Sequence, residues 1–161
     1  MIFVVQEHRS RRRHWDFRLE IGGVLKSWAV PKGPSLDPSQ RRLAIETPDH
    51  DLDYASYEGI IPEGGYGAGP VLIWDHGPLE ILSADPETDL GRGELRFKLS
   101  GRILKGEFAL VKMSGPGRER AWLLVKGRDA YAREGWETPS LLTAEACSRL
   151  RVKQPPCAIG A

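Results

Sequence analysis

Three polar side chains of different chemistry alternate with large apolar ones near the start of the chain. His14, Asp16 and Arg18 share one parity, and Trp15 and Phe17 occupy the positions between them. Because successive side chains of a strand point to opposite faces, one face would carry the polar set and the other the aromatic rings. An imidazole and a carboxylate can hold a divalent metal, and a guanidinium beside them can bind a phosphate. The pattern predicts a half-buried strand whose polar face is either such a site or an ordinary solvated surface.

The segment that follows favours the site. Gly22-Gly23 is a two-residue hairpin signal that tolerates positive φ at both positions. A hairpin closed there would pair Phe17 with Trp28, which is a strong apolar contact. On the other face the small residues Ser27 and Ala29 would lie opposite the polar set. A merely solvated face does not need the room that they leave, whereas a metal and its substrate do.

A metal site needs a third ligand, because two side chains bind a metal weakly. His8 lies six residues before His14, just after the apolar run Ile2-Phe3-Val4-Val5. Together with Asp16 the two histidines would offer two imidazoles and one carboxylate, a set that suits Mn²⁺, Zn²⁺ or Fe²⁺ without choosing among them. The alternative is that His8 is an ordinary loop histidine.

The remainder of the chain is typical of a β-rich protein. Its 161 residues fit one domain with a real core, and its 18 Gly and 12 Pro indicate many turns. We expect a domain over residues 1–131 and a C-terminal appendage over residues 132–161, with a short helix over 143–150 capped by Thr143. The strand candidates are 2–6, 13–21, 24–30, 41–46, 71–74, 79–82, 94–99, 101–104, 106–113 and 121–126.

Composition limits the classes of partner. The formal net charge is only +1, but four arginines lie within residues 9–13, a local basic stripe that suits a nucleic-acid backbone or is simply an exposed turn. The two cysteines, Cys147 and Cys157, lie in the tail and form neither a disulfide framework nor a zinc motif. Without a signal peptide or a long apolar run, we expect a cytoplasmic protein with no membrane partner.

Two further segments are interpreted as loops. The stretch Gly64 to Gly69 lacks the Gly-Lys-Ser/Thr ending of a phosphate-binding loop, and a strand-like run follows it. We expect either a tight turn that brings backbone near the groove or an ordinary glycine-rich connection. His76 lies in the turn-like sequence Asp75 to Pro78 and is expected to be a surface loop residue.

Several of these motifs, taken in order, resemble the 3′-phosphoesterase module of bacterial DNA ligase D, an enzyme of non-homologous end joining. The similarity extends from about Phe3 to about Tyr131. The segments that carry it are His8 to Glu20, Leu25 to Pro34, Arg42 to Ala44, Asp49 to Tyr54, Glu58 to Gly69 and Trp122 to Asp129.

The resemblance implies a compact, closed or nearly closed β-barrel with a metal site in a surface groove. It implies Mn²⁺-dependent removal of a 3′-terminal ribonucleoside and of a 3′-phosphate from DNA or DNA/RNA ends, with Zn²⁺ or Co²⁺ as alternative metals. A DNA ligase, a repair polymerase and a Ku-type protein are the implied partners. By matching position, His8, His14 and Asp16 would bind the metal. Arg18, Lys32, Arg42, His50 and Tyr54 would bind the phosphate, and Arg18, His50 and Tyr54 would take part in catalysis.

The sequence departs from the family's motifs at two places, and two other classes of function are considered beside the phosphoesterase. Pro48 stands where the family often carries an acidic residue, and only seven residues precede His8, so we expect phosphate removal to be faster than ribonucleoside release. The first alternative to the phosphoesterase is a nucleic-acid-binding barrel without catalytic activity. An iron oxygenase that uses 2-oxoglutarate would need His50 or His76 as its third ligand, and neither is followed by the Arg-x-Ser of that class.

Overall fold

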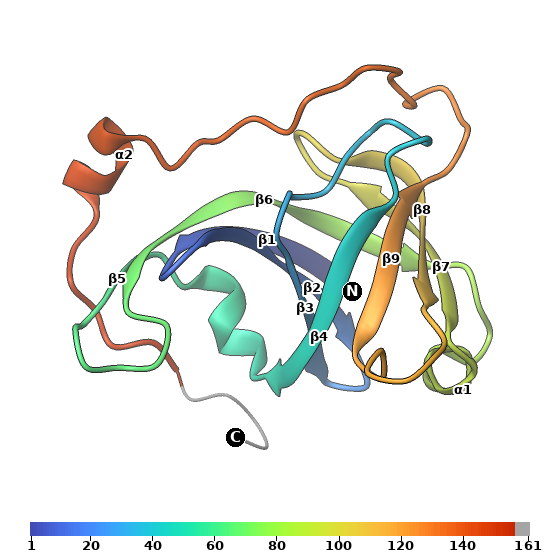
Figure 1. Ribbon diagram of the computed structural model, residues 1–161, viewed down its shortest axis with the longest axis horizontal. Coiled ribbons are helices and arrows are strands. Elements are labelled where there is room, and N and C mark those ends of the chain that lie inside the picture. The colour runs from blue at the N-terminus through green and yellow to red at the C-terminus, as the bar shows by residue number, and fades with distance from the viewer. Residues whose placement is uncertain (157–161) are drawn as a thin grey trace.

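A computed structural model describes residues 1–156 of the chain. Within this range one nine-stranded antiparallel sheet carries most of the regular structure (Figure 1). Its strands are β1 (Ile2–Arg9), β2 (Arg13–Ile21), β3 (Val24–Val30), β4 (Arg42–His50), β5 (Gly59–Ile61), β6 (Gly69–Ile81), β7 (Glu94–Ser100), β8 (Lys105–Lys112) and β9 (Ala121–Lys126). Eight of them close a barrel in the order β1-β2-β3-β4-β9-β8-β7-β6, since β6 pairs back with β1, and β5 adds to β6. The all-β barrel is confirmed.

The first hairpin has the register that its loop predicts. Gly22 and Gly23 have φ of 64° and 81°, so both positions use the positive-φ conformation that glycine tolerates. Phe17 lies opposite Trp28 and Asp16 lies opposite Ala29. This register places the aromatic residues of β2 inside the barrel and its polar residues on the outer wall.

Two apolar clusters lie on opposite faces of these first strands. The larger one fills the barrel and includes Phe3, Val5, Phe17 and Trp28, each at most 1% exposed. The smaller one covers part of the outer wall, where the 3₁₀ helix η1 (Leu52–Ser56) and β5 pack. Its buried members are Leu25, Tyr54, Tyr57, Ile61 and Val71. The polar face of β2 is therefore held between a rigid barrel and a second apolar layer.

The strand β6 corrects two expectations. Its thirteen residues run without a break through Asp75 to Pro78, which we expected to be a turn between two strands, and His76 is an exposed strand residue. Gly77 explains this composition, because a Cβ there would lie 2.3 Å from the carbonyl oxygen of Ser100. The glycine allows two backbones to approach closely and does not mark a turn.

Residues 101–104, expected to form a strand, are instead a connection held by one carboxylate. Asp75 accepts hydrogen bonds from the backbone N–H groups of Arg102, at 2.8 Å, and of Leu104, at 2.7 Å. Backbone donors that bind a side chain are not available for a ladder, which explains why no strand forms. The helix α1 (Pro86–Arg92) was not predicted, although Asp85 caps it by accepting from the backbone N–H of Thr88.

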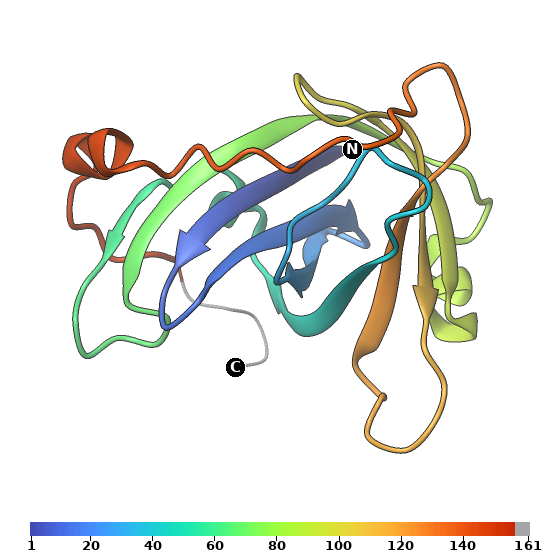
Figure 2. The same cartoon turned by 45° about the horizontal axis from the view of Figure 1, so that its top comes forward.

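The C-terminal segment lies along the barrel (Figure 2). Glu7 of β1, which is fully buried, accepts hydrogen bonds from the Ser140 hydroxyl and from the backbone N–H groups of Leu141 and Leu142. The predicted helix is present as α2 (Ala144–Arg149) with Thr143 as its cap. The division at residue 131 stays a prediction. Cys147 is a free thiol, and Cys157 lies outside the described residues. Across residues 1–156, every helix is too short or too polar to cross a membrane.

Candidate metal and phosphate site

The three predicted metal ligands converge on the outer wall of the barrel. His8 and His14 are direct partners in the pairing of β1 with β2, and Asp16 is two residues further along β2. One potential ligand atom from each residue lies within 4.8 Å of the other two. The carboxylate of Asp16 lies 3.5 Å from His8 Nδ1 and 3.2 Å from His14 Nε2. Spacing along two adjacent strands thus produces the group that the sequence predicts.

Hydrogen bonds to backbone carbonyls orient both imidazoles. His8 Nε2 lies 2.6 Å from the carbonyl oxygen of Gly67, and His14 Nδ1 lies 3.2 Å from that of Arg12. A carbonyl only accepts, so these two nitrogens carry the protons of the neutral rings. In the neutral rings the lone pairs are then on His8 Nδ1 and His14 Nε2, the nitrogens that face Asp16, whereas in a protonated ring the same nitrogen donates to that carboxylate. A metal-binding histidine typically donates the N–H of its other ring nitrogen to a protein oxygen, as both rings do here. The two histidines and Asp16 therefore fit a divalent cation.

The electrostatics of the group also suit a cation ligand. Burial would raise the pKa of Asp16, but hydrogen bonds with His14 and His8 and the charge of Arg18 hold that pKa far below its usual range. Burial would lower the pKa of His14, but its hydrogen bond and charge interaction with Asp16 give a net increase. The carboxylate is therefore ionised near neutral pH, and a metal competes with the proton that Asp16 favours on His14.

Arg18 lies beside this group with its guanidinium almost fully buried. Its Nε donates to Gln6 Oε1 at 2.8 Å and its Nη1 to Ser27 Oγ at 2.9 Å. Its Cζ lies 4.6 Å from the centre of the Tyr54 ring, and its Nη2 lies 3.6 Å from Asp16 Oδ2. Because Nη2 carries two N–H groups and has only this long polar contact with residues 1–156, it retains donor capacity for a phosphate oxygen.

Gln6 is a buried residue of this site that the sequence analysis did not identify. Its side chain is inaccessible to solvent, and its amide nitrogen donates to the carbonyl oxygens of Tyr54 at 2.9 Å and Tyr57 at 3.0 Å. Its amide oxygen accepts from Arg18. One side chain thus joins the position of η1 to that of the guanidinium. The sequence shows only a polar residue directly after the apolar run Ile2-Phe3-Val4-Val5.

His50 and Tyr54 are also brought to Arg18. The two rings lie 4.5 Å apart, and His50 Nδ1 lies 3.1 Å from Arg18 Nη1 and 2.9 Å from the Pro48 carbonyl. Burial and the charge of Arg18 lower the pKa of His50 to about 4. The ring is therefore less basic than an ordinary histidine in the free protein. At pH 7 the ring is neutral. Its Nδ1 faces both the Arg18 guanidinium, which only donates, and the Pro48 carbonyl, which only accepts, so these two contacts favour opposite tautomers.

Lys32 and Arg42 contact each other instead of the metal group. Arg42 Nη1 donates to the Lys32 carbonyl at 3.1 Å, and Nη2 donates to Gln40 Oε1 at 2.9 Å. Strand alternation gives Arg42 the parity of Ala44, which is fully buried in the barrel core. The Lys32 side chain is exposed. Their predicted phosphate contacts stay predictions.

The glycine-rich loop does bring backbone to the site. Gly67 has φ of 71°, and its carbonyl oxygen is the one that binds His8. A Cβ at this position would lie 3.1 Å from His8 Cε1. The loop therefore supports a metal ligand, which agrees with the prediction of a tight turn near the groove.

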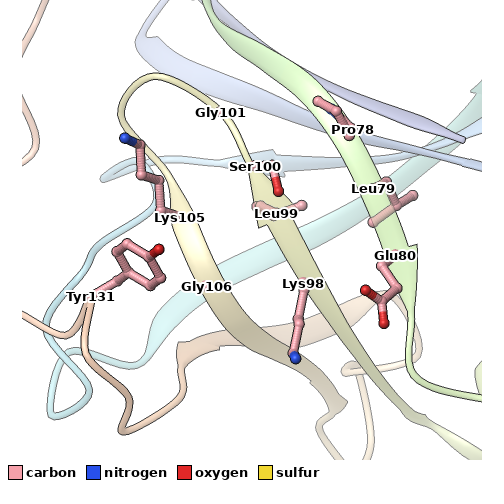
Figure 3. Close-up of a pocket in the computed structure, with 10 residues that line it drawn as sticks. All are labelled: Pro78, Leu79, Glu80, Lys98, Leu99, Ser100, Gly101, Lys105, Gly106 and Tyr131. Atoms are coloured by element: carbon pink, nitrogen blue, oxygen red, sulfur yellow. The ribbon is translucent and has the colours of Figure 1, made fainter.

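A separate hollow lies on the outer face of the opposite strands (Figure 3). Its volume is about 610 Å³, and residues of β6, β7 and β8 line it together with Tyr131. Lys98 and Lys105 supply its positive charge, and Glu80 supplies a negative one. None of the predicted metal or phosphate residues lines it, so the chemistry expected from the sequence lies on the β1–β2 side.

Comparison with known proteins identifies the family. The family model described as "DNA Ligase D 3'-phosphoesterase domain" matches residues 6–112. The chain belongs to this family. All eight predicted site residues of this phosphoesterase domain, from His8 to Tyr54, lie within the matched range. The resemblance inferred from the motifs is confirmed.

Proteins similar to this phosphoesterase domain have further parts. The multifunctional non-homologous end joining protein LigD of Pseudomonas aeruginosa is 50% identical over 131 residues, which cover 81% of this chain and 16% of that protein. The corresponding DNA repair protein of Mycobacterium tuberculosis is 50% identical over 158 residues, 94% of this chain and 20% of that protein. The LigD of Mycolicibacterium smegmatis is 37% identical over the same length. The chain spans a fifth or less of these curated relatives.

The donor set favours the phosphoesterase over the oxygenase alternative. Within residues 1–156, the group of three residues able to share a metal contains His8, and neither His50 nor His76 belongs to it. His50 packs on Tyr54 and Arg18, and His76 is exposed on β6. The third donor thus comes from β1, as the phosphoesterase motif implies.

Proposed function

We propose that this chain is a metal-dependent DNA 3′-end phosphoesterase that uses Mn²⁺ to remove a 3′-phosphate and leave a 3′-hydroxyl. The observation that carries the proposal is the convergence of His8, His14 and Asp16, with Arg18 next to the carboxylate. Family membership supports the reaction class. The metal requirement, the choice of Mn²⁺ and the DNA substrate are what the experiment below tests.

His8, His14 and Asp16 would hold the cation. When bound there, a divalent cation supplies charge neutralisation at the phosphate and lowers the pKa of water. Arg18 donates to a non-bridging phosphate oxygen through Nη2. Its other nitrogens are already fixed by Gln6 and Ser27, so little reorganisation is needed when the phosphate arrives. Preorganised donors of this kind stabilise the charge that develops during phosphoryl transfer.

His50 would act as a hydrogen-bond donor to the phosphate. Of the two neutral tautomers, the one that accepts from Arg18 at Nδ1 has its proton on Nε2, where it would donate to an oxygen of the substrate. Because its pKa is low, His50 is not protonated at neutral pH before the substrate binds. Tyr54 would support this arrangement, because its ring contacts both His50 and Arg18.

The substrates we propose are DNA and DNA/RNA 3′ ends. A 3′-terminal ribonucleoside would be removed more slowly than a phosphate, because Pro48 stands two positions before His50, where the family often carries an acidic residue. A DNA ligase, a repair polymerase or a Ku-type protein would share these ends, since the relatives are named for non-homologous end joining. Lys32 and Arg42 would provide further positive charge toward the backbone phosphates.

A primer–template assay tests the proposal. The primer is labelled at its 5′ end and carries a 3′-phosphate, and the protein is added with Mn²⁺ or with EDTA. We expect phosphate release only with Mn²⁺, and a loss of at least about 100-fold in His14→Ala, which removes one ligand. His76→Ala is the matched control, because this histidine is exposed and outside the metal group. It should release phosphate at the unmodified rate.

Three outcomes would contradict parts of the proposal. Binding of the primer without turnover would identify a nucleic-acid-binding barrel that lacks catalysis. Equal rates in Mn²⁺ and in EDTA would exclude the metal requirement. A second primer that ends in one ribonucleotide tests the other step, and release of that nucleoside as fast as phosphate would contradict the predicted order.

A further inference from the structure

Two loops meet at the metal group and support it in the same way. The turn after β1 supplies the Arg12 carbonyl to His14, and the connection between β5 and β6 supplies the Gly67 carbonyl to His8. The strand ends that carry the two loops lie against each other, because a Cβ at Gly69 would lie only 2.0 Å from the Arg9 carbonyl oxygen. Figure 2 shows the turn and the connection side by side at one end of the barrel.

The side chains at the tips of these loops point to solvent. Tyr66, next to Gly67, is fully exposed, with a relative accessibility of 102%. Arg11 and Arg12 are exposed as well, and neither has an ion-pair partner within residues 1–156. Because its ring is not buried, Tyr66 contributes no packing to the fold. Its neighbour Gly67 nevertheless contacts His8 of the metal group.

The combination of an exposed ring and unpaired arginines suits a nucleic-acid strand. Proteins that bind single strands pair cationic side chains with phosphates and stack aromatic rings on bases. A base also has the flat apolar face that an exposed tyrosine ring can cover, whereas free phosphate has none. Glu63, the charged residue of this loop, is three positions before Tyr66 in the sequence and is exposed to solvent.

We propose that Tyr66 stacks on the base of the 3′-terminal nucleotide while Arg11 and Arg12 bind the phosphates that precede it. This inference rests on the proposed function and specifies its substrate. It also gives the glycine-rich loop two tasks, since its backbone orients His8 and its tip holds the nucleotide. A 3′ end seated in this way would present its terminal phosphate to Arg18 and to the cation that His8, His14 and Asp16 would hold.

Fluorescence anisotropy with a labelled primer–template that ends in a 3′-hydroxyl measures binding without turnover. We expect Tyr66→Ala to raise Kd about tenfold, in the range seen when a stacking aromatic is removed. Tyr66→Phe keeps the ring and should keep Kd within twofold. Tyr131→Ala is the matched control, because this tyrosine is also exposed, at 47%, and lines the hollow of Figure 3 instead.

A primer whose last nucleotide is abasic identifies the contact. The unmodified protein should bind this primer about tenfold more weakly, and Tyr66→Ala should then add no further loss, because the same contact is already absent. Equal losses on the intact and abasic primers would overturn the stacking contact, and so would a Kd for Tyr66→Ala within twofold of the unmodified protein. Loss of binding in Tyr66→Phe as well would point to the hydroxyl and contradict the proposal.

The phosphate-release assay separates this inference from the proposed function. Absence of phosphate release by the unmodified protein in Mn²⁺ refutes the phosphoesterase, whatever the anisotropy shows. Normal release together with an unchanged Kd in Tyr66→Ala refutes only the stacking contact. Normal release with the predicted Kd pattern supports both.

Discussion

Replacing Gly67 by alanine should weaken metal binding although the residue offers no ligand. Gly67 holds His8 through its carbonyl oxygen at 2.6 Å, and this contact keeps the lone pair of Nδ1 toward Asp16. An added Cβ would lie 3.1 Å from His8 Cε1, so the ring or the loop must move by a few tenths of an ångström. Either movement lengthens the hydrogen bond that orients the ligand.

The expected magnitude has two parts. An L-residue in the left-handed region costs about 1–2 kcal/mol of folding free energy, and Gly67 has φ of 71°. Loss of a second contact on a metal ligand typically lowers metal affinity about 10- to 100-fold, or about 1.4–2.7 kcal/mol. The first part acts on stability, whereas the second acts on Mn²⁺ binding.

Gly64→Ala separates the two parts. Gly64 is in the same loop and has φ of 85°, but a Cβ there would meet no atom within 4 Å. Both variants should lose similar stability in urea unfolding without metal. In calorimetric titration with Mn²⁺, only Gly67→Ala should raise Kd by about tenfold or more. Equal Mn²⁺ affinities in the two variants would refute the role assigned to the Gly67 carbonyl.

Three other side chains give independent tests. Mn²⁺ competes with a proton on His14, whose pKa is raised, so the apparent affinity should increase from pH 6 to pH 8, and a pH-independent titration would contradict this. Gln6→Leu leaves two carbonyls and one guanidinium N–H without their partner and should lower the unfolding free energy by about 2–4 kcal/mol in urea, against a loss below 1 kcal/mol if the contacts are unimportant. The pKa of His50 in the folded protein, about 4, lies below its ordinary value of 6.5. As the pH falls, the unfolded chain therefore binds this proton before the folded protein does. The stability that the neutral ring contributes is complete above pH 6.5 and declines toward pH 4. His50→Gln should therefore flatten the fall in stability between pH 7 and pH 4.5, and an unchanged pH profile would speak against a buried neutral imidazole.

Local patterns predicted the first hairpin and the metal group. Alternation placed His14 and Asp16 on one face, and the Gly22-Gly23 loop fixed the register with β3 because a two-residue turn leaves no freedom in pairing. His8 was within reach because β1 and β2 form a tight antiparallel pair, which places it directly opposite His14. These features depend on residues close together in the sequence.

Features that depend on distant contacts were missed or misread. Gly77 and Pro78 are typical of a turn, but they lie within a strand. A side chain at Gly77 would collide with the backbone of Ser100, which lies more than twenty residues later in the chain. Gln6 binds η1 across about fifty residues, and no local pattern reports that. The helix α1 is different, since Asp85-Pro86 is a recognisable start signal for a helix and was overlooked.

Alternation along β4 also limits what motif matching can transfer. The resemblance led us to expect a phosphate contact for Arg42, but this residue has the parity of the core residue Ala44, and its hydrogen bonds are with Lys32 and Gln40. A motif specifies residue identity, whereas the direction of a side chain is decided by the strand that carries it.

Diffraction from crystals grown with Mn²⁺, recorded for its anomalous signal, tests the central claim most directly. Our account predicts one strong peak on the outer wall of the barrel, bonded to His8 Nδ1, His14 Nε2 and the Asp16 carboxylate, next to Arg18. A peak bonded to other residues, or a saturated crystal in which the Asp16 carboxylate still contacts both imidazoles with no ion between them, would contradict it.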